Sequence, residues 1–147
     1  GGGDIFMKRL LPIFKASFFV PLFGDGSTKF QPVFIDDVSL AVDEIINSQI
    51  ERKNIYELAG SRIYSYQEFF NHISEFLNKT RVLVPVPMKI MKPLINIAEK
   101  TPFSPLTSEQ LTLFEKNNLM VNIDKSFKNL HINPQDTLQI LKNIVVN

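Results

Sequence analysis

Cysteine is absent from the 147 residues, which excludes disulfide bonds, thiolate metal sites and a cysteine nucleophile. Histidine occurs only at His72 and His131, and their spacing to each other and to the carboxylates suits no metal site. No apolar run approaches the ~18–20 residues that a membrane-spanning helix needs. No charged segment followed by an apolar one opens the sequence, so we expect no signal peptide.

Two enzyme motifs are missing as well. No serine lies in G-x-S-x-G, the nucleophile motif of hydrolases. Gly24-Asp25-Gly26 is not a dinucleotide fingerprint, because that fingerprint needs G-x-G-x-x-G between a strand and a helix. Here the glycines lead into a second predicted strand. The sequence therefore predicts no catalytic residue and no metal or cofactor site of its own.

Apolar residues make up 44% of the chain and aromatic residues 11%, with thirteen Phe and no Trp. This composition suffices for one globular domain with a hydrophobic core. The net charge of +1 gives no reason to expect nucleic-acid binding. Charge is uneven: residues 1–78 hold 7 basic and 10 acidic side chains, and residues 79–147 hold 9 and 5. The basic second part suits an acidic partner or an anionic lipid surface, although a solvated face is the simpler explanation and is preferred.

Residues 30–48 predict a short strand, two carboxylates and an amphipathic helix. Pro32 cannot donate to a ladder, so the strand should lie at an edge. Asp36 and Asp37 stand where the helix begins, and we expect one to cap it and the other to be solvated. Adjacent residues on a helix point in different directions, which argues against a shared metal ion.

Further helices are predicted by apolar spacing and by capping motifs. A first helix covers residues 4–15, and Pro12 should kink or end it. Ser65–Glu68 and Thr107–Gln110 match the capping box, with hydrophobic staples formed by Tyr64 with Phe69 and by Leu106 with Leu111. The remaining predicted helices are an amphipathic one over Met88–Lys100, a short one before His131, and a closing one that carries Leu138, Leu141 and Val145.

Strands are predicted at residues 18–23 and 29–35, joined by five turn residues, and we expect them to pair as a β-hairpin. Residues 54–60 and 82–86 predict two more short strands, and Pro85 and Pro87 make the second edge-like.

The segment PLFGDGSTKFQPVFIDDVSLAV resembles "G-x-G-x-x-x-x-P-V-x-V-x-D-V-A-x-A" of the atypical, extended short-chain dehydrogenase/reductases. The chain is most similar to the branch that contains the NADPH-binding accessory subunit of respiratory complex I. NIYELAG followed by YSYQEFF, and then VLVPVPMKIMKPL, match in the same order. The resemblance covers nearly the whole chain, but only the C-terminal part of that family's fold. Where the family has "L-G-I-x-P", His131 replaces the glycine, so His131 should adopt the left-handed conformation.

The resemblance implies an α/β fold: a C-terminal, substrate-side lobe with the last strand or strands of a Rossmann protein, a β-hairpin, short edge strands and five to six helices. Residues 1–60 would join the Rossmann sheet, residues 61–147 would form a mostly helical lobe, and the N-terminal Gly-rich cofactor domain would be absent. Gly3 and Asp4 would lie at the edge of the cofactor cleft. The substrate-side candidates are Lys29, Gln31, Pro32 and Val33.

The chain alone is expected to bind no cofactor, whereas NADPH or NADH is implied for the full-length parent. The expected partners are the N-terminal Rossmann half, other subunits, or a second copy paired through exposed strands. The implied location is cytoplasmic, or peripheral on the inner face of an energy-transducing membrane. The Tyr-x-x-x-Lys pair of the reductases is absent, because the residues four positions after the three tyrosines are Gly60, Glu68 and Phe70.

Three functions stay open. The first is a structural, assembly or nucleotide-sensing role in a protein related to the complex I subunit. The second is the substrate-binding lobe of an active epimerase, dehydratase or reductase, which would need a proton donor upstream. The third is a self-contained module that docks on a protein or a membrane through the basic amphipathic helix Met88–Lys100.

Overall fold

The computed structural model describes residues 5–48, 55–100, 107–121 and 125–146. Six α-helices and four short strands are present in these residues, together with two turns of 3₁₀-helix. In chain order they are α1 (Ile5–Ala16), β1 (Phe19–Phe23), β2 (Lys29–Phe30), α2 (Ile35–Asn47), β3 (Tyr64–Ser65), α3 (Tyr66–Phe76), β4 (Val82–Val86), α4 (Met88–Ala98), α5 (Ser108–Leu111), η1 (Thr112–Phe114), η2 (Phe127–Leu130) and α6 (Thr137–Val146).

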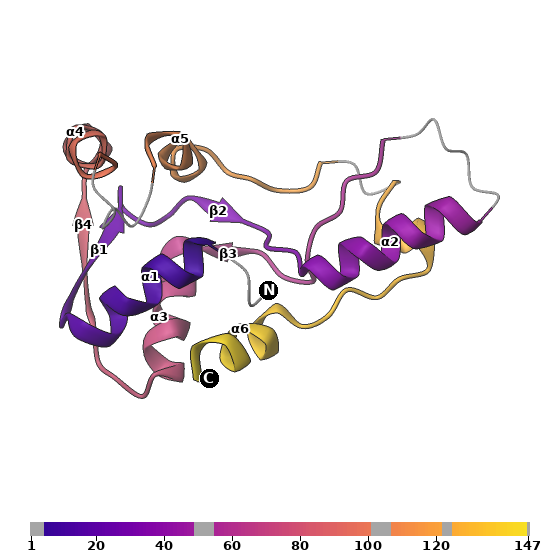
Figure 1. Cartoon of the computed structure of the whole chain (residues 1–147), viewed down its shortest axis with the longest axis horizontal. Coiled ribbons are helices and arrows are strands. Elements are labelled where there is room, and N and C mark those ends of the chain that lie inside the picture. The colour runs from indigo at the N-terminus through magenta and orange to yellow at the C-terminus, as the bar shows by residue number, and fades with distance from the viewer. Residues whose placement is uncertain (1–4, 49–54, 101–106, 122–124, 147) are drawn as a thin grey trace.

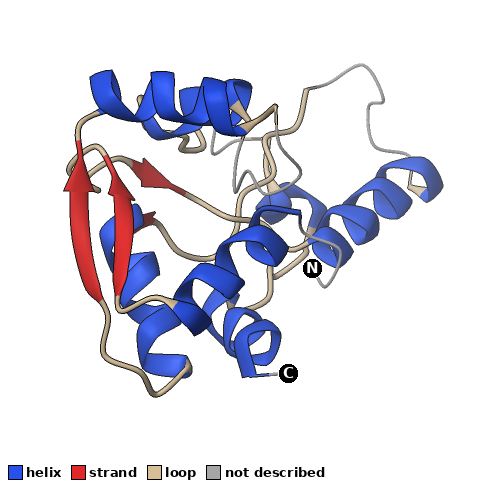
Figure 2. Cartoon of the chain, turned by 60° about the vertical axis from the view of Figure 1, so that its left-hand side comes forward, coloured by secondary structure: helices blue, strands red, loops and turns tan. Residues whose placement is uncertain are grey.

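The strands form two separate two-stranded sheets, and the predicted hairpin is wrong. β1 pairs in parallel with β4, Phe19 opposite Val82, while β2 pairs antiparallel with β3. Gly24 and Gly26 both adopt positive φ, and the Gly24 N–H donates to the Val86 carbonyl at 2.9 Å. This turn extends the pairing of β1 with β4 by one bond and then directs the chain away from β1. Figure 2 shows β1 and β4 side by side, with α4 beyond one end of the sheet.

Residues 55–60, where a strand was predicted, are irregular. The Glu57 N–H donates to the Lys125 carbonyl at 2.9 Å, but no strand pairs with residues 55–60 in the part of the chain that the structure describes. A strand is stabilised by its ladder, so a β-favouring sequence without a neighbouring strand stays irregular.

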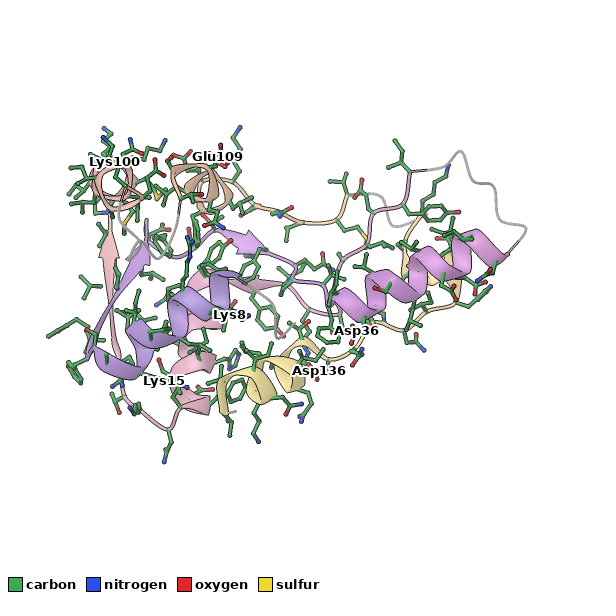
Figure 3. The ribbon with its side chains drawn as sticks, in the orientation of Figure 1. Lys8, Lys15, Asp36, Lys100, Glu109 and Asp136 are labelled. Carbon is green, nitrogen blue, oxygen red and sulfur yellow. The ribbon has the colours of Figure 1, made fainter. Side chains whose placement is uncertain are left out.

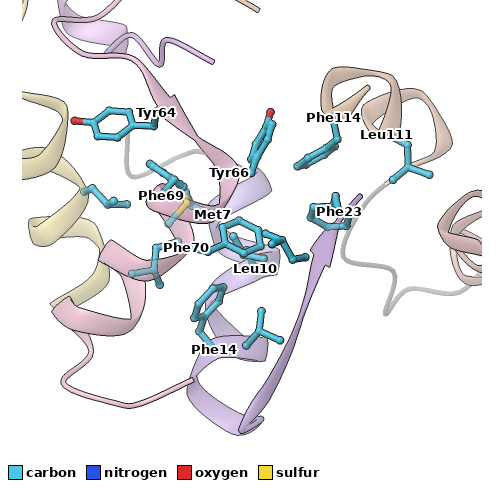
Figure 4. Packing of buried hydrophobic residues seen from close by; sticks show 14 of the residues in the cluster. Met7, Leu10, Phe14, Phe23, Tyr64, Tyr66, Phe69, Phe70, Leu111 and Phe114 are labelled. Carbon is cyan, nitrogen blue, oxygen red and sulfur yellow. The ribbon is translucent and has the colours of Figure 1, made fainter. Parts of the chain in front are cut away.

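Aromatic side chains fill the main core, which lies between α1, α3, β1 and η1 (Figure 4). Phe14 and Phe70 meet edge to face, with ring centroids 5.3 Å apart. The ring centroid of Phe23 lies 4.1 Å from that of Phe114 and 6.1 Å from that of Phe70. Such pairs add about 0.5–1.5 kcal/mol each beyond the burial of their area. The bias towards phenylalanine therefore serves the core.

The first helix does not end at Pro12, since α1 continues to Ala16. The carbonyls of its last turn are bonded by basic side chains. The Arg81 Nε donates to the Phe14 carbonyl at 2.6 Å, and the Lys79 Nζ donates to the Lys15 carbonyl at 3.1 Å. Cations at a helix C-terminus also interact favourably with its dipole, so these side chains stabilise the last turn of α1.

Both capping boxes are confirmed. The Ser65 hydroxyl accepts the Glu68 N–H at 3.1 Å, and the Glu68 carboxylate accepts the Ser65 N–H at 2.7 Å. Thr107 and Gln110 exchange the same pair of bonds. The staple of Tyr64 on Phe69 forms with ring centroids 6.1 Å apart, whereas Leu106 lies outside the described residues. These caps fix where α3 and α5 begin.

Helix α2 lies at the far end of the molecule from the β1–β4 sheet and α4 (Figure 1). Only Asp37 and Ala41 of α2 are buried, and Ala41 packs with Phe127 and Leu130 of η2 in a second, small cluster. No helix among the described residues is both long enough and apolar enough to cross a bilayer.

Candidate substrate-side cleft

Gln31 follows β2 and connects three segments of the chain. Its side-chain Nε2 donates to the Gly60 carbonyl at 2.9 Å, and its Oε1 accepts the Met120 N–H at 3.4 Å. Its backbone N–H donates to the Asn118 carbonyl at 3.2 Å. The amide thus has both its donor and its acceptor engaged, which fixes its orientation.

Two hollows adjoin this amide. One of about 520 Å³ is bordered by Gln31, Gly60, Met120, Lys128 and His131. The other, of about 450 Å³, is bordered by Gln31, Val33, Glu57, Asn118 and Met120. Both fall within the size range of small-molecule sites. We refer to the two together as the Gln31 cleft.

Gly60 is needed where the chain passes behind Gln31. A Cβ at Gly60 would lie 1.8 Å from the Pro32 carbonyl oxygen and 3.1 Å from the Thr137 Oγ1. That same Pro32 oxygen accepts the Thr137 hydroxyl at 3.3 Å. Two backbone segments and the start of α6 therefore meet at a spacing that only glycine allows.

His131 ends η2 in the left-handed conformation, with φ 54° and ψ 29°, as predicted from the family's glycine at this point. Its N–H donates to the Lys128 carbonyl at 3.2 Å, and the next N–H, of Ile132, donates to the Phe127 carbonyl at 3.0 Å. A residue with a Cβ adopts this conformation at some cost in strain. The turn places His131 and Ile132 on the wall of the larger hollow.

Asp37 neither caps α2 nor lies in solvent, so the expected capping aspartate is wrong, whereas a solvated aspartate is found at Asp36. The N-cap of α2 is Phe34, which makes no side-chain cap bond. Asp36 is exposed, whereas Asp37 is 2% exposed. The Asp37 carboxylate accepts the backbone N–H of Gln135 at 2.9 Å and its side-chain Nε2 at 3.0 Å. Asp37 thus holds the segment before α6 against α2.

The other predicted site residues are dispersed. Lys29 is exposed and borders neither hollow, while its backbone N–H donates to the Asn117 Oδ1 at 2.9 Å. Pro32 and Val33 border a small apolar cavity of about 80 Å³ against α6. Gly3 and Asp4 lie outside the described residues. Gln31 and Val33 are therefore the predicted residues that border the cleft.

The cleft suits binding better than acid–base chemistry. Its carboxylate, on Glu57, accepts the Val121 N–H at 2.7 Å, and its other polar side chains are the amides of Gln31, Asn118 and Asn133 together with Ser126, Lys128 and His131. Strong pKa shifts occur elsewhere, where burial raises the pKa of Tyr66 to about 12. Among the described residues, no group of three or more His, Asp or Glu side chains is placed to hold a metal ion.

Gly60, Asp37 and Gln135 were missed as cleft-shaping residues. Gly60 stood out only as a turn residue, and nothing in the local sequence shows that a carbonyl lies against it. Asp37 and Gln135 are 98 positions apart, so no local pattern connects them. Only the fold reveals either contact.

Comparison with family models gives no match, but curated proteins do match. The chain is 28% identical over 109 residues to the mitochondrial NADH-ubiquinone oxidoreductase 40 kDa subunit of Neurospora crassa, covering 74% of this chain and 29% of that protein. It is 31% identical over 98 residues to the mitochondrial NADH dehydrogenase [ubiquinone] 1 alpha subcomplex subunit 9 of Arabidopsis thaliana, covering 63% and 24%. The chain thus spans about a quarter of the length of these relatives.

Among solved structures, the triphenylmethane reductase of Citrobacter sp. shares the fold, with a TM-score of 0.70 at 15% identity. The match covers 97% of this chain and 48% of the reductase. A second structure of that enzyme, complexed with NADP(H), gives a TM-score of 0.69. These comparisons confirm the resemblance seen in the sequence: the chain has the α/β fold of part of a Rossmann-type NAD(P)-binding protein, and it is related to the short-chain dehydrogenase/reductase-like subunits of NADH-ubiquinone oxidoreductase.

Proposed function

We propose that this chain is the C-terminal, substrate-side part of an NAD(P)-binding, short-chain dehydrogenase/reductase-like protein, with a structural, assembly or nucleotide-sensing role and no activity of its own. The observation that carries the proposal is the pair of sequence matches to complex I subunits, over 109 and 98 residues. The fold supports it, because the chain aligns with about half of a reductase that has been solved with NADP(H).

In this proposal residues 1–60 join the Rossmann sheet of the parent and residues 61–147 form its partner lobe. Gln31 and Val33, which border the Gln31 cleft, line its wall opposite the nicotinamide, and Gly3 and Asp4 stand at its edge. The bonds of Gln31 to Gly60 and Met120 support a role in shaping that wall. The cofactor would be NADPH or NADH, held by residues of the parent outside this chain.

Helix α2 supplies a surface for the rest of the parent. Ile35, Val42 and Ile46 follow one side of the helix, and each is about half exposed. Exposed apolar rows of this kind mark interfaces. The buried side of α2, which packs through Ala41 on η2, lies about a third of a turn away from this row. The upstream part of the parent or another subunit would cover the exposed parts of the row.

The names of both relatives include "mitochondrial", and we infer the same location for the parent, peripheral to the inner membrane as a subunit of a larger complex. The absence of the Tyr-x-x-x-Lys pair from these 147 residues supports a non-catalytic lobe. An active parent would need that proton donor upstream.

Titration of NADPH tests the proposal in two proteins. One is this chain, and the other is a chimera in which the chain replaces the aligned segment of the Neurospora crassa subunit. We expect no saturable binding to the folded chain and stoichiometric binding to the chimera. Tight binding to the chain alone would refute the division of roles, and rapid NADPH oxidation by the chimera would favour an active enzyme.

A pair of variants of α2 in the chimera tests the partner surface. Val42 and Leu40 are comparably exposed, at 48% and 55%, but two residues are about 200° apart around a helix. Val42→Glu should lower the melting temperature and weaken NADPH binding, whereas Leu40→Glu should do neither. Equal effects of the two variants would contradict the assignment of this surface.

A further inference from the structure

Helix α4 carries two apolar rows, and only one of them packs on the protein. Met91 and Ile95 are buried against the core, each 5% exposed. Ile90, Leu94 and Ile97 form a second row at spacings of four and three residues, and they are 53%, 54% and 69% exposed. We call this second row the α4 outer row.

The basic residues of α4 divide into two groups. The Lys92 Nζ pairs with the Glu115 Oε1 at 2.6 Å, so this charge ties the helix to the residues after η1. At about 100° per residue, Lys89 lies about a quarter turn from the α4 outer row. Lys100 follows two residues after the end of α4 at Ala98, and Figure 3 shows it at the same edge of the molecule. Both lysines are exposed, so two positive side chains lie near the exposed apolar row.

The nearby carboxylate of Glu99 is engaged away from this row. One of its oxygens accepts the backbone N–H of Ser108 at 2.7 Å and the Ser108 hydroxyl at 2.8 Å, and these bonds hold the pKa of Glu99 below its usual value. Glu99 thus stays ionised and fastens the end of α4 to the start of α5. The α4 outer row itself contains no acidic residue.

The position of α4 leaves the outer row accessible. The helix lies at the outer edge of the molecule, beyond the end of the β1–β4 sheet and beside α5 (Figures 1 and 2). Figure 3 shows Lys100 at this edge, far from α6 and from α2. A convex helix with aliphatic side chains on its outer surface and lysines beside them matches the boundary between lipid headgroups and acyl chains.

We propose that α4 is a membrane-surface contact: Ile90, Leu94 and Ile97 insert into the interface of an anionic bilayer, while Lys89 and Lys100 lie at the level of its phosphates. Charge complementarity selects the lipid surface as the occupant, because each lysine near an anionic surface contributes to binding. Aliphatic area alone would fit a protein groove equally well. The inference does not depend on nucleotide binding by the parent.

Flotation of the 147-residue chain with vesicles tests the contact, using phosphatidylcholine alone and phosphatidylcholine mixed with phosphatidylglycerol. We expect the chain to float with the anionic vesicles and to dissociate as salt is raised. Leu94→Ser with Ile97→Ser should weaken binding at least ~10-fold, because two aliphatic side chains no longer insert. Lys89→Glu with Lys100→Glu should weaken it by ~30-fold or more.

Matched controls lie elsewhere on the surface. Leu40→Ser changes an aliphatic residue of α2 that is 55% exposed, and Lys142→Glu reverses an exposed charge of α6. Neither should alter flotation. All variants should keep the far-ultraviolet circular dichroism and melting temperature of the unsubstituted 147-residue chain. Absence of flotation by the unchanged chain, or equal losses in the controls, would overturn the proposal.

Sedimentation velocity distinguishes the competing occupant, a second copy of the chain. If the α4 variants abolish a dimer while the chain binds no vesicles, the row is a protein contact and the membrane proposal is wrong.

Discussion

Replacing Gly60 by alanine adds one methyl group at the most crowded backbone crossing of the cleft. Its three nearest neighbours would be the Pro32 carbonyl oxygen at 1.8 Å, the Pro32 carbonyl carbon at 2.9 Å and the Thr137 Oγ1 at 3.1 Å. Contacts of a Cβ under 3.0 Å essentially do not occur, so the Pro32 carbonyl would have to retreat by about 1.2 Å. A backbone carbonyl cannot rotate away as a side chain can, so the whole segment must move.

The cost follows from the contacts that this movement disturbs. Overpacking of a close-packed site costs about 1–3 kcal/mol. The retreat also strains the bond from Thr137 to the Pro32 carbonyl, and displacement of Gly60 strains the bond from Gln31 to the Gly60 carbonyl. Each of these bonds contributes about 0.5–1.5 kcal/mol. We therefore expect Gly60→Ala to lower the free energy of unfolding by about 2–6 kcal/mol.

Urea unfolding followed by circular dichroism measures this loss, and Gly24→Ala is the matched control. Gly24 has φ +63°, but a Cβ there would meet only the Met88 Cγ, at 3.8 Å. Its replacement should cost only the left-handed conformation, about 1–2 kcal/mol. The steric argument requires the larger loss at Gly60. Equal midpoints for the two variants, or a larger loss for Gly24→Ala, would refute it.

Three further predictions concern residues outside this crossing. Burial raises the pKa of Tyr66 from 10.0 to about 12, so the folded state favours the neutral phenol. The contribution of Tyr66 to the free energy of unfolding is complete below pH 10, and about 2.7 kcal/mol of it is lost as the pH rises to about 12. Tyr66→Phe should abolish this loss in urea titrations at each pH. Arg81→Ala removes the charge-assisted bond to the Phe14 carbonyl and should lower the free energy of unfolding by about 1.5–3 kcal/mol, with Arg81→Lys in between; an unchanged urea midpoint for Arg81→Ala would contradict the role of that bond. Asp37→Ala removes the acceptor of the Gln135 N–H and Nε2 and should cost about 1–3 kcal/mol, whereas the exposed neighbour changed as Asp36→Ala should stay within about 0.5 kcal/mol by the same assay.

Local sequence signals predicted the features whose causes are local. The capping boxes at Ser65 and Thr107 are correct because both partners lie within four residues. The left-handed turn at His131 is correct because a helix end followed by a turn constrains a single residue. Helices α1, α4 and α6 follow from apolar spacing, with ends that differ from the prediction by one or a few residues.

Strand pairing was not predictable in the same way. The runs before and after Gly24–Thr28 have the pattern of a hairpin, but each pairs with a strand that follows much later in the chain. A β pattern records that a segment suits a sheet and carries no information about its partner. For the same reason Ile55–Gly60 has a strand-like sequence and no ladder in the described structure.

The cleft was predicted in position but not in detail. Gln31 and Val33 border it, as expected from the family resemblance, yet the sequence could not show that the Gln31 amide is engaged by Gly60 and Met120. Lys29 was chosen for its charge, and its side chain extends into solvent instead. Polarity identifies residues that can contact a ligand, whereas the fold decides which of them face the same space.

The parallel pairing of β1 with β4 sets an order of events during synthesis of the chain. Phe19 emerges from the ribosome roughly 60 residues before Val82, its partner in the sheet, which corresponds to about 3–12 s at normal elongation rates. Throughout that interval β4 is not available to pair with β1, and Phe18 and Phe19 stay exposed even in the finished fold. Nascent chains that stall before Val82 would therefore present an apolar strand that lacks β4 and can pair with another copy.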